Sequence, residues 1–213
     1  MNSAENVFKF YVLANKLKNV IRTGWKKWNV ECHRLESVAE HIYGVQMLAI
    51  AIHSEYQYDI DIQKVIFMLA VHELEEISIG DLTQFEISKE EKRRIGYKAV
   101  CEVLDGLTNK EYILQLIEEF EERQTKESKF AYQCDKLECD LQCKLYDDKN
   151  YVDLNKQENN EILNDELVEQ LLKEGKSWSD MWMTFGQMNY NYDNNFKAIS
   201  DYVNSQNCIK REN

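Results

Sequence analysis

The sequence predicts an all-α fold, and three observations carry this prediction. The chain of 213 residues has no proline, although about ten are ordinary for its length, so the commonest helix breaker is absent. Apolar residues recur at helical spacing in several segments. Three Ser/Thr-x-x-Glu sequences, typical of capped helix starts, begin at Ser37, Ser88 and Thr108.

The first helix is expected over residues 4–21, where apolar side chains form a stripe of approximately helical period. Gly24 suits the C-terminal end of that helix. Residues 26–36 are rich in aromatic and cationic side chains. We interpret them as an irregular loop between two helices, which is a common place for a binding site.

The second helix is expected to begin after Ser37, with Glu40 as the partner residue of the capping box, and to end near Tyr56. Its apolar residues form one helical stripe. His41 lies beside this stripe, close to the start of the helix. Its imidazole is therefore predicted to point into the core.

The third helix is expected to be capped by Asp59 or Asp61, and its apolar face continues to His72 and Glu76. Residues four apart are neighbours on a helix surface, so these last two side chains are predicted to lie side by side. The chain then turns, which allows Asp81 to fold back over the helix end.

Capping and apolar patterns predict further helices downstream, over residues 88–104, 108–123, 128–146, 164–173 and 195–203. The stretch 147–160 is polar and suits a loop or boundary. We therefore expect a core of residues 1–150 and a C-terminal helical extension of residues 151–213 that packs on it.

Charge and composition exclude several classes of partner. The formal net charge of −12 argues against binding of nucleic-acid polymers and against a polybasic membrane contact. The N-terminus has no signal-peptide pattern, and the longest apolar run is short of a membrane span. We expect a soluble, cytoplasmic protein. The six cysteines include no C-x-x-C pair and are expected to be reduced apolar residues; a thiolate metal site at Cys134, Cys139 and Cys143 is the alternative.

The candidate chemistry centres on His41 and His72. A lone histidine on an apolar face is more often a core residue than a metal ligand. Here two inward-facing histidines lie on adjacent helices, and four carboxylates follow the second within ten residues. Burying such a cluster is costly without a cation. Mixed imidazole and carboxylate ligands favour Mn, Fe, Co or Zn over Ca.

The order of these motifs resembles the HD-domain metal-dependent phosphohydrolases, most closely the 5′-deoxynucleotidase branch. Four local patterns within residues 10–146 carry the resemblance: Arg22–Trp25, Glu36–His41, His72–Glu76 followed by Gly80 and Asp81, and Asp135–Glu138. The resemblance implies that the core of residues 1–150 is an all-α HD-domain bundle with one metal ion between helices. It also implies a homodimer.

The resemblance further assigns roles to eight residues. The implied metal ligands are His41, His72, Glu73 and Asp135. The groups implied to handle the attacking water and proton transfer are Glu76 and Asp81. The implied substrate contacts are Arg22, which holds the phosphate, and Trp25, which lies against the sugar.

One departure from the family pattern concerns the acid beside the second histidine. The family has His-Asp, whereas this chain has His72-Glu73, whose carboxylate stands one methylene further from the backbone. We predict hydrolysis of small-molecule substrates, (deoxy)nucleoside 5′-monophosphates, to nucleoside and phosphate. One alternative is a non-catalytic or weakly active nucleotide-binding protein on the HD scaffold. Another is a phosphodiesterase or a nucleotide triphosphohydrolase, which needs more basic groups than the Arg22 segment offers.

Overall fold

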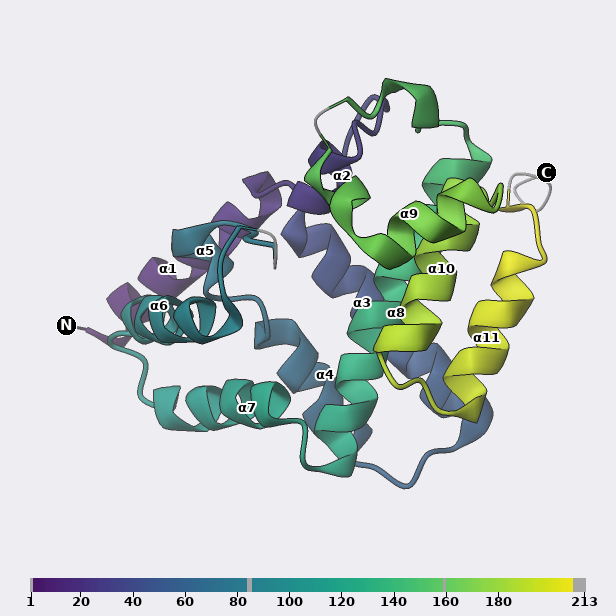
Figure 1. Cartoon of the computed structure of the whole chain (residues 1–213). Helices are drawn as coiled ribbons and strands as arrows, with labels where there is room; N and C mark the ends of the chain where they lie inside the picture. The colour runs from purple at the N-terminus through teal and green to yellow at the C-terminus, as the bar shows by residue number, and fades with distance from the viewer. Residues whose placement is uncertain (1, 84–85, 159, 209–213) are drawn as a thin grey trace. The chain divides into compact units, whose positions relative to one another are not determined.

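The computed structural model describes residues 2–83, 86–158 and 160–208. Within these residues all regular structure is helical, and there is no β-strand (Figure 1). A single isolated antiparallel β-bridge joins Ile21 to Ser37 in the described chain. The predicted all-α class is confirmed. Among the described helices, none combines the length and the apolar character that crossing a membrane requires.

Contacts divide the chain into two compact units that are interleaved along the sequence. Unit 1 consists of Met1–Thr23 and Glu36–Tyr132. Unit 2 consists of Gly24–Leu35 and Gln133–Asn213. The predicted boundary near residue 150 stays a prediction.

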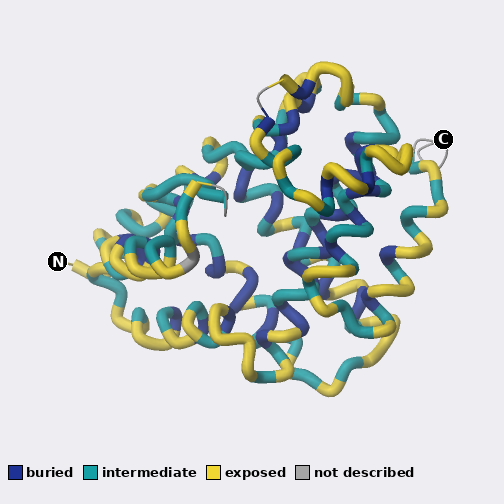
Figure 2. Tube along the Cα trace, viewed as in Figure 1, coloured by how far each residue is buried: buried dark blue, intermediate teal, exposed yellow. Residues whose placement is uncertain are grey.

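Unit 1 is built mainly from pairs of packed helices. In it α3 packs on α4, α4 packs on α7, and α5 packs on α6. The buried positions recur along α3 and α4 at helical spacing (Figure 2). The elements within this unit are α1 (Ser3–Ala14), the 3₁₀ helix η1 (Asn15–Asn19), α3 (Val38–Tyr56), α4 (Ile62–Val71), α5 (Glu76–Ile79), α6 (Lys89–Val103) and α7 (Lys110–Glu122).

Unit 2 has an aromatic core. It gathers all four tryptophans of the chain, and the ring centroids of Trp25 and Trp182 lie 5.2 Å apart. Helix α10 packs on both α9 and α11. The helices and 3₁₀ turns of this unit are η2 (Leu154–Lys156), η3 (Glu161–Asn164), α9 (Glu166–Lys173), α10 (Trp178–Asn189) and α11 (Asn194–Asn204). Two further helices, α2 (Thr23–Lys27) and α8 (Lys126–Asp148), begin in unit 1 and end in unit 2.

The predicted helix starts are confirmed where the cap is local. Ser37 and Glu40 form the full capping box of α3. Asp61 caps α4, and Ser88 caps α6. The box predicted at Thr108 is wrong, because α7 begins after Asn109, whose side chain makes no cap hydrogen bond. This shift of one residue moves the expected glutamate away from the third helical position that a capping box requires.

Two predictions near the N-terminus are also wrong. The first α-helix ends at Ala14 and continues only as a 3₁₀ turn to Asn19. Gly24 does not end a helix; it lies inside α2, so the segment interpreted as an irregular loop begins with a helical turn. Trp28 is only 1% exposed, so part of that segment is core rather than a solvated binding loop.

Candidate active site and metal centre

Two buried histidines, one in α3 and one directly after α4, face each other in unit 1. His41 follows the Ser37 cap in the first turns of α3 and is fully buried, as predicted. His72 is the residue directly after α4 and is 2% exposed. Their ring centroids lie 5.8 Å apart. The capping box fixes where α3 starts, and thereby where His41 enters the core.

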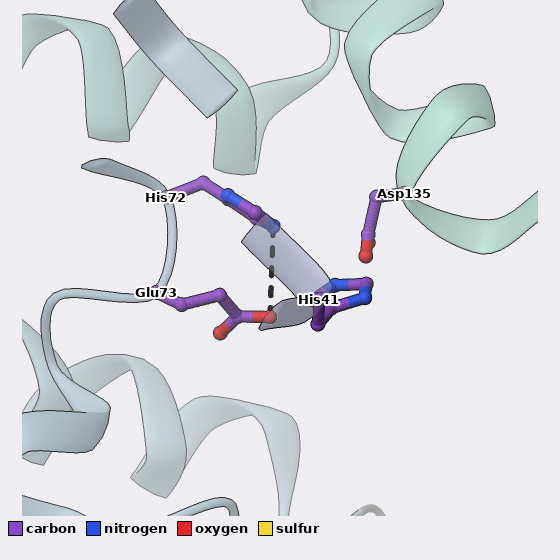
Figure 3. A group of neighbouring side chains, drawn as sticks. All are labelled: His41, His72, Glu73 and Asp135. Atoms are coloured by element: carbon purple, nitrogen blue, oxygen red, sulfur yellow. Dashed lines mark ion pairs between the residues drawn. The ribbon is translucent and has the colours of Figure 1, made fainter. Parts of the chain in front are cut away.

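The His72 ring has one nitrogen committed to the backbone. Nδ1 lies 2.8 Å from the carbonyl oxygen of Leu69. Because a carbonyl only accepts, Nδ1 donates this hydrogen bond, and Nε2 is the ring nitrogen left to bind a metal ion. A backbone partner on the second ring nitrogen is the usual arrangement for a metal-binding histidine. Nε2 lies 3.6 Å from Oε1 of Glu73 (Figure 3).

A carboxylate joins the two imidazoles. His41, His72 and Glu73 each offer one ligand atom, and these atoms lie within 4.8 Å of one another. The extra methylene of Glu73 therefore leaves its carboxylate within reach of both rings. This set of two nitrogens and a carboxylate oxygen, largely buried, fits a divalent ion such as Mn, Fe, Co or Zn.

Asp135, which Figure 3 draws with these three side chains, belongs to unit 2. It lies on α8, three residues after Tyr132, which ends the part of α8 in unit 1. Asp135 is 3% exposed, and its Oδ2 lies 2.8 Å from Nζ of Lys136. Its predicted role as a fourth ligand stays a prediction.

The chain between α4 and α5 departs from the predicted continuous helix. Helix α4 ends at Val71, and the next turn is held by shorter-range hydrogen bonds, such as Leu74 N to Val71 O at 3.2 Å and Glu76 N to Glu73 O at 3.2 Å. The prediction that His72 and Glu76 lie on one helical face is therefore wrong. In a continuous α-helix, adjacent side chains point about 100° apart. Because of this turn, the side chains of His72 and Glu73 can approach the same point, and Nε2 of His72 lies near Oε1 of Glu73.

Glu76 begins α5 and is 1% exposed. Burial, together with the charges of Glu73 and Asp81, raises its pKa to about 11, while Arg22 and Lys92 act in the opposite direction. Its Oε2 atom has no hydrogen-bond partner among the described residues. A nearby divalent cation stabilises ionised carboxylates, so this surplus of buried acid fits a metal-binding site.

Arg22 and Asp81, both predicted functional residues, lie near the carboxylates of Glu73 and Glu76. Arg22 Nη1 lies 3.6 Å from Glu73 Oε1. The arginine is held by its backbone, which donates to the carbonyl of Glu36 at 3.1 Å beside the Ile21–Ser37 bridge. Asp81 accepts a hydrogen bond from the Thr23 amide and so braces the start of α2.

Trp25 has a different environment. It is 2% exposed, and its ring packs in the aromatic core of unit 2, with the Tyr146 centroid at 5.3 Å. The indole is thus a core side chain of that unit. Its predicted contact with a sugar stays a prediction.

The sequence analysis missed Lys92. This residue reaches from α6 to within 3.5 Å of Glu76 Oε1. Burial lowers its pKa, but the surrounding carboxylates, Glu73 first among them, outweigh burial and raise the pKa above the ordinary value. No local motif marks it, since its partner lies on another helix. The sequence offers one clue: Lys92 lies one turn from Gly96 on the same face of α6, and a glycine inside a helix can mark a face that packs closely on another segment.

Comparison with known proteins defines the class. A profile of the HD domain matches residues 14–174, which include every predicted site residue. The chain therefore belongs to the HD domain family. This agrees with the paired histidines, the acid beside the second one and the all-α fold.

Among curated proteins, the chain is similar to 5′-deoxynucleotidase HDDC2 of Dictyostelium discoideum, with 35% identity over 67% of this chain and 78% of that protein. It is 31% identical to 5′-deoxynucleotidase HDDC2 of Homo sapiens, over 69% of this chain and 71% of that one. Among solved structures, a conserved hypothetical protein from Pyrococcus furiosus superposes with a TM-score of 0.58 at 28% identity, over 78% of this chain and 97% of the other.

Proposed function

We propose that this protein is a metal-dependent 5′-nucleotidase that hydrolyses deoxynucleoside 5′-monophosphates to nucleoside and phosphate. Its curated relatives are named 5′-deoxynucleotidases, which supports this substrate class. One structural observation carries the proposal. Oε1 of Glu73 lies 3.6 Å from both His72 Nε2 and Arg22 Nη1, so a metal-ligand set adjoins a cation suited to phosphate.

The proposed metal ligands are His41, His72, Glu73 and Asp135. The first three lie together in unit 1. Support for Asp135 comes from its burial, from its place on a helix that begins in unit 1, and from the motif order of the family. We propose Mn, Co, Fe or Zn as the ion. The chemistry that such an ion supplies when bound is activation of water and polarisation of a phosphoryl oxygen.

The protein's own groups are assigned to the remaining steps. Arg22 binds the phosphate through its planar guanidinium. Glu76 orients the attacking water and takes its proton. Burial and the charges of Glu73 and Asp81 oppose the ionised form that this requires, Arg22 and Lys92 favour it, and the charge of a bound metal ion would favour it further. As the water oxygen bonds to phosphorus, the bond to the 5′ oxygen breaks. The proton that Glu76 has taken passes to that leaving oxygen with the assistance of Asp81, and Trp25 is assigned to the sugar.

The two alternative functions find less support. The Glu73 carboxylate lies with the imidazoles rather than away from them, which weakens the argument for a degenerate site. The relatives are named as 5′-deoxynucleotidases, which favours monophosphates over diesters and triphosphates.

The test measures phosphate release by the purified protein loaded with Mn or Co. We expect turnover of dAMP or dCMP and little release from dATP or a phosphodiester. His41→Asn should lose bound metal and lower kcat/KM by at least about a hundredfold. His53→Asn, on the same helix but outside the cluster, is the matched control and should behave as wild type. Absence of turnover with every mononucleotide, despite bound metal, contradicts the proposal.

A homodimer and a cytoplasmic location are further parts of this proposal, and the homodimer rests on the family resemblance. Light scattering at several protein concentrations measures the first, and cell fractionation measures the second. A monomer at all concentrations contradicts the dimer without touching the proposed chemistry.

A further inference from the structure

Lys92 contacts two segments of the proposed active site at once. Its Nζ lies 3.5 Å from Oε1 of Glu76, and the same ammonium donates a hydrogen bond to the backbone carbonyl of Leu82 at 3.0 Å. Leu82 directly follows Asp81. One side chain on α6 therefore connects both proposed catalytic carboxylates, the first through an ion pair and the second through its backbone neighbour.

This ion pair is not an ordinary surface contact. The Glu76 side chain is 1% exposed and that of Lys92 is 30% exposed. Charges attract more strongly where water is excluded, whereas exposed pairs contribute little. Placing an ammonium in this position restrains the Glu76 carboxylate.

Helix α6 packs closely against the turn that carries Glu75 and Glu76, because Gly96 has no side chain. A Cβ atom at this position would lie 3.3 Å from Cγ of Glu75. Gly96 is buried and lies one turn from Lys92 on the same face of α6. The face of α6 on which Gly96 contacts Glu75 is therefore the same face from which Lys92 reaches Glu76.

The two cations near the cluster contact different acids. Arg22 lies beside Glu73, a proposed metal ligand, and Lys92 lies beside Glu76. We propose that Lys92 is a positioning residue that fixes the Glu76 carboxylate and, through the Leu82 carbonyl, the turn that carries Asp81. This inference rests on the proposed function of the same site.

The kinetic test compares Lys92→Met, Lys92→Arg and Lys98→Met in the full-length, metal-loaded protein. Lys98 is an exposed lysine on the same helix and provides the matched control. We expect Lys92→Met to lower kcat by about 10- to 100-fold, as loss of an outer-shell partner does, with KM and metal content close to wild type. Lys92→Arg should recover part of kcat, and Lys98→Met should not differ from wild type.

A second readout does not depend on activity. In the metal-free protein, the amides of residues 76–83 should exchange with solvent at least about threefold faster in Lys92→Met than in Lys98→Met, because the turn loses its anchor. Exchange in α3 should be unchanged. If the wild type shows no turnover, the proposed function fails, and exchange alone decides the role of Lys92.

Three results overturn the inference. One is a kcat for Lys92→Met within about threefold of wild type. Another is a fall in kcat that matches the loss of bound metal or folded protein and is not restored by arginine. The third is unchanged exchange of residues 76–83 in Lys92→Met.

Discussion

Glu76, buried in unit 1, lies among other carboxylates, whereas Asp140, buried in unit 2, has a hydrogen-bonded tyrosine as its partner. Asp140 accepts a hydrogen bond from the Tyr192 hydroxyl at 2.8 Å and packs against Gly186. Burial is the main cause that raises its pKa. Glu76 is buried too, but the neighbouring anions Glu73 and Asp81 raise its pKa further.

The difference separates an acid with a structural role, Asp140, from an acid that we propose takes part in the reaction, Glu76. A single buried acid such as Asp140 can remain protonated because burial disfavours its charged form. The neutral Tyr192 hydroxyl donates to its Oδ2, and its Oδ1 has no hydrogen-bond partner among the described residues. Several acids held together beside imidazoles repel one another, and a divalent cation relieves that repulsion. Burial alone therefore does not mark a site; burial combined with like charge and metal-binding nitrogens does.

Among the variants that test this contrast between the two units, we expect Glu73→Asp to have the largest effect on activity. Glu73 Oε1 lies 3.6 Å from His72 Nε2, and shortening the side chain by one methylene withdraws the carboxylate from the ring. We expect metal affinity and kcat/KM to fall by about tenfold. Metal titration and steady-state kinetics measure both quantities. A large gain in turnover from a nearly inactive wild type would instead identify a degenerate site.

The next prediction concerns Asp140 in unit 2, whose protonation should make the free energy of unfolding depend on pH. Its pKa in the folded protein lies above the ordinary value of 3.8, so the folded state holds a proton that the unfolded state releases. The contribution of Asp140 to stability is thus present at low pH and is lost as pH rises above about 4, by at most about 1.4 kcal/mol per pH unit. Asp140→Asn should flatten this dependence.

Denaturant titrations between about pH 4 and pH 7 measure the slope for wild type and Asp140→Asn. The difference between the two proteins isolates Asp140 from the other acids. Activity of the variant should remain near that of wild type, because Asp140 lies outside the metal-ligand set. An unchanged slope means that Asp140 is ionised in the folded state and contradicts the contrast drawn between the two regions.

The parts of the fold that follow from local chemistry were predictable. The side chain of Ser37 accepts a hydrogen bond from the amide of Glu40, three residues ahead. Both the start of α3 and the inward position of His41 therefore follow from neighbouring residues. The same holds for Asp61 and for Ser88. The motif order likewise identified His72 and Glu73 as partners of His41.

The parts that depend on packing between distant segments were not predictable. The break after Val71 has no proline or glycine to mark it, and the apolar pattern continues across it. Lys92 acquires its role only when α6 packs on α5. Gly24 suits a helix end by composition, but Asp81 binds the neighbouring Thr23 amide and the segment becomes helical. These features require knowledge of tertiary contacts.

The smallest expected effect compares two glycines, one in each unit. Gly80 has φ of +74° and Gly175 has φ of +80°, and an added Cβ would meet no atom within 4 Å at either position. Replacing each with alanine should lower the free energy of unfolding by about 1 kcal/mol, because a Cβ disfavours this backbone conformation. Gly80 turns the chain into Asp81, whereas Gly175 follows α9 in unit 2. Gly80→Ala should therefore lower kcat and Gly175→Ala should not. Equal loss of activity in both variants would mean that the turn at Gly80 contributes only stability.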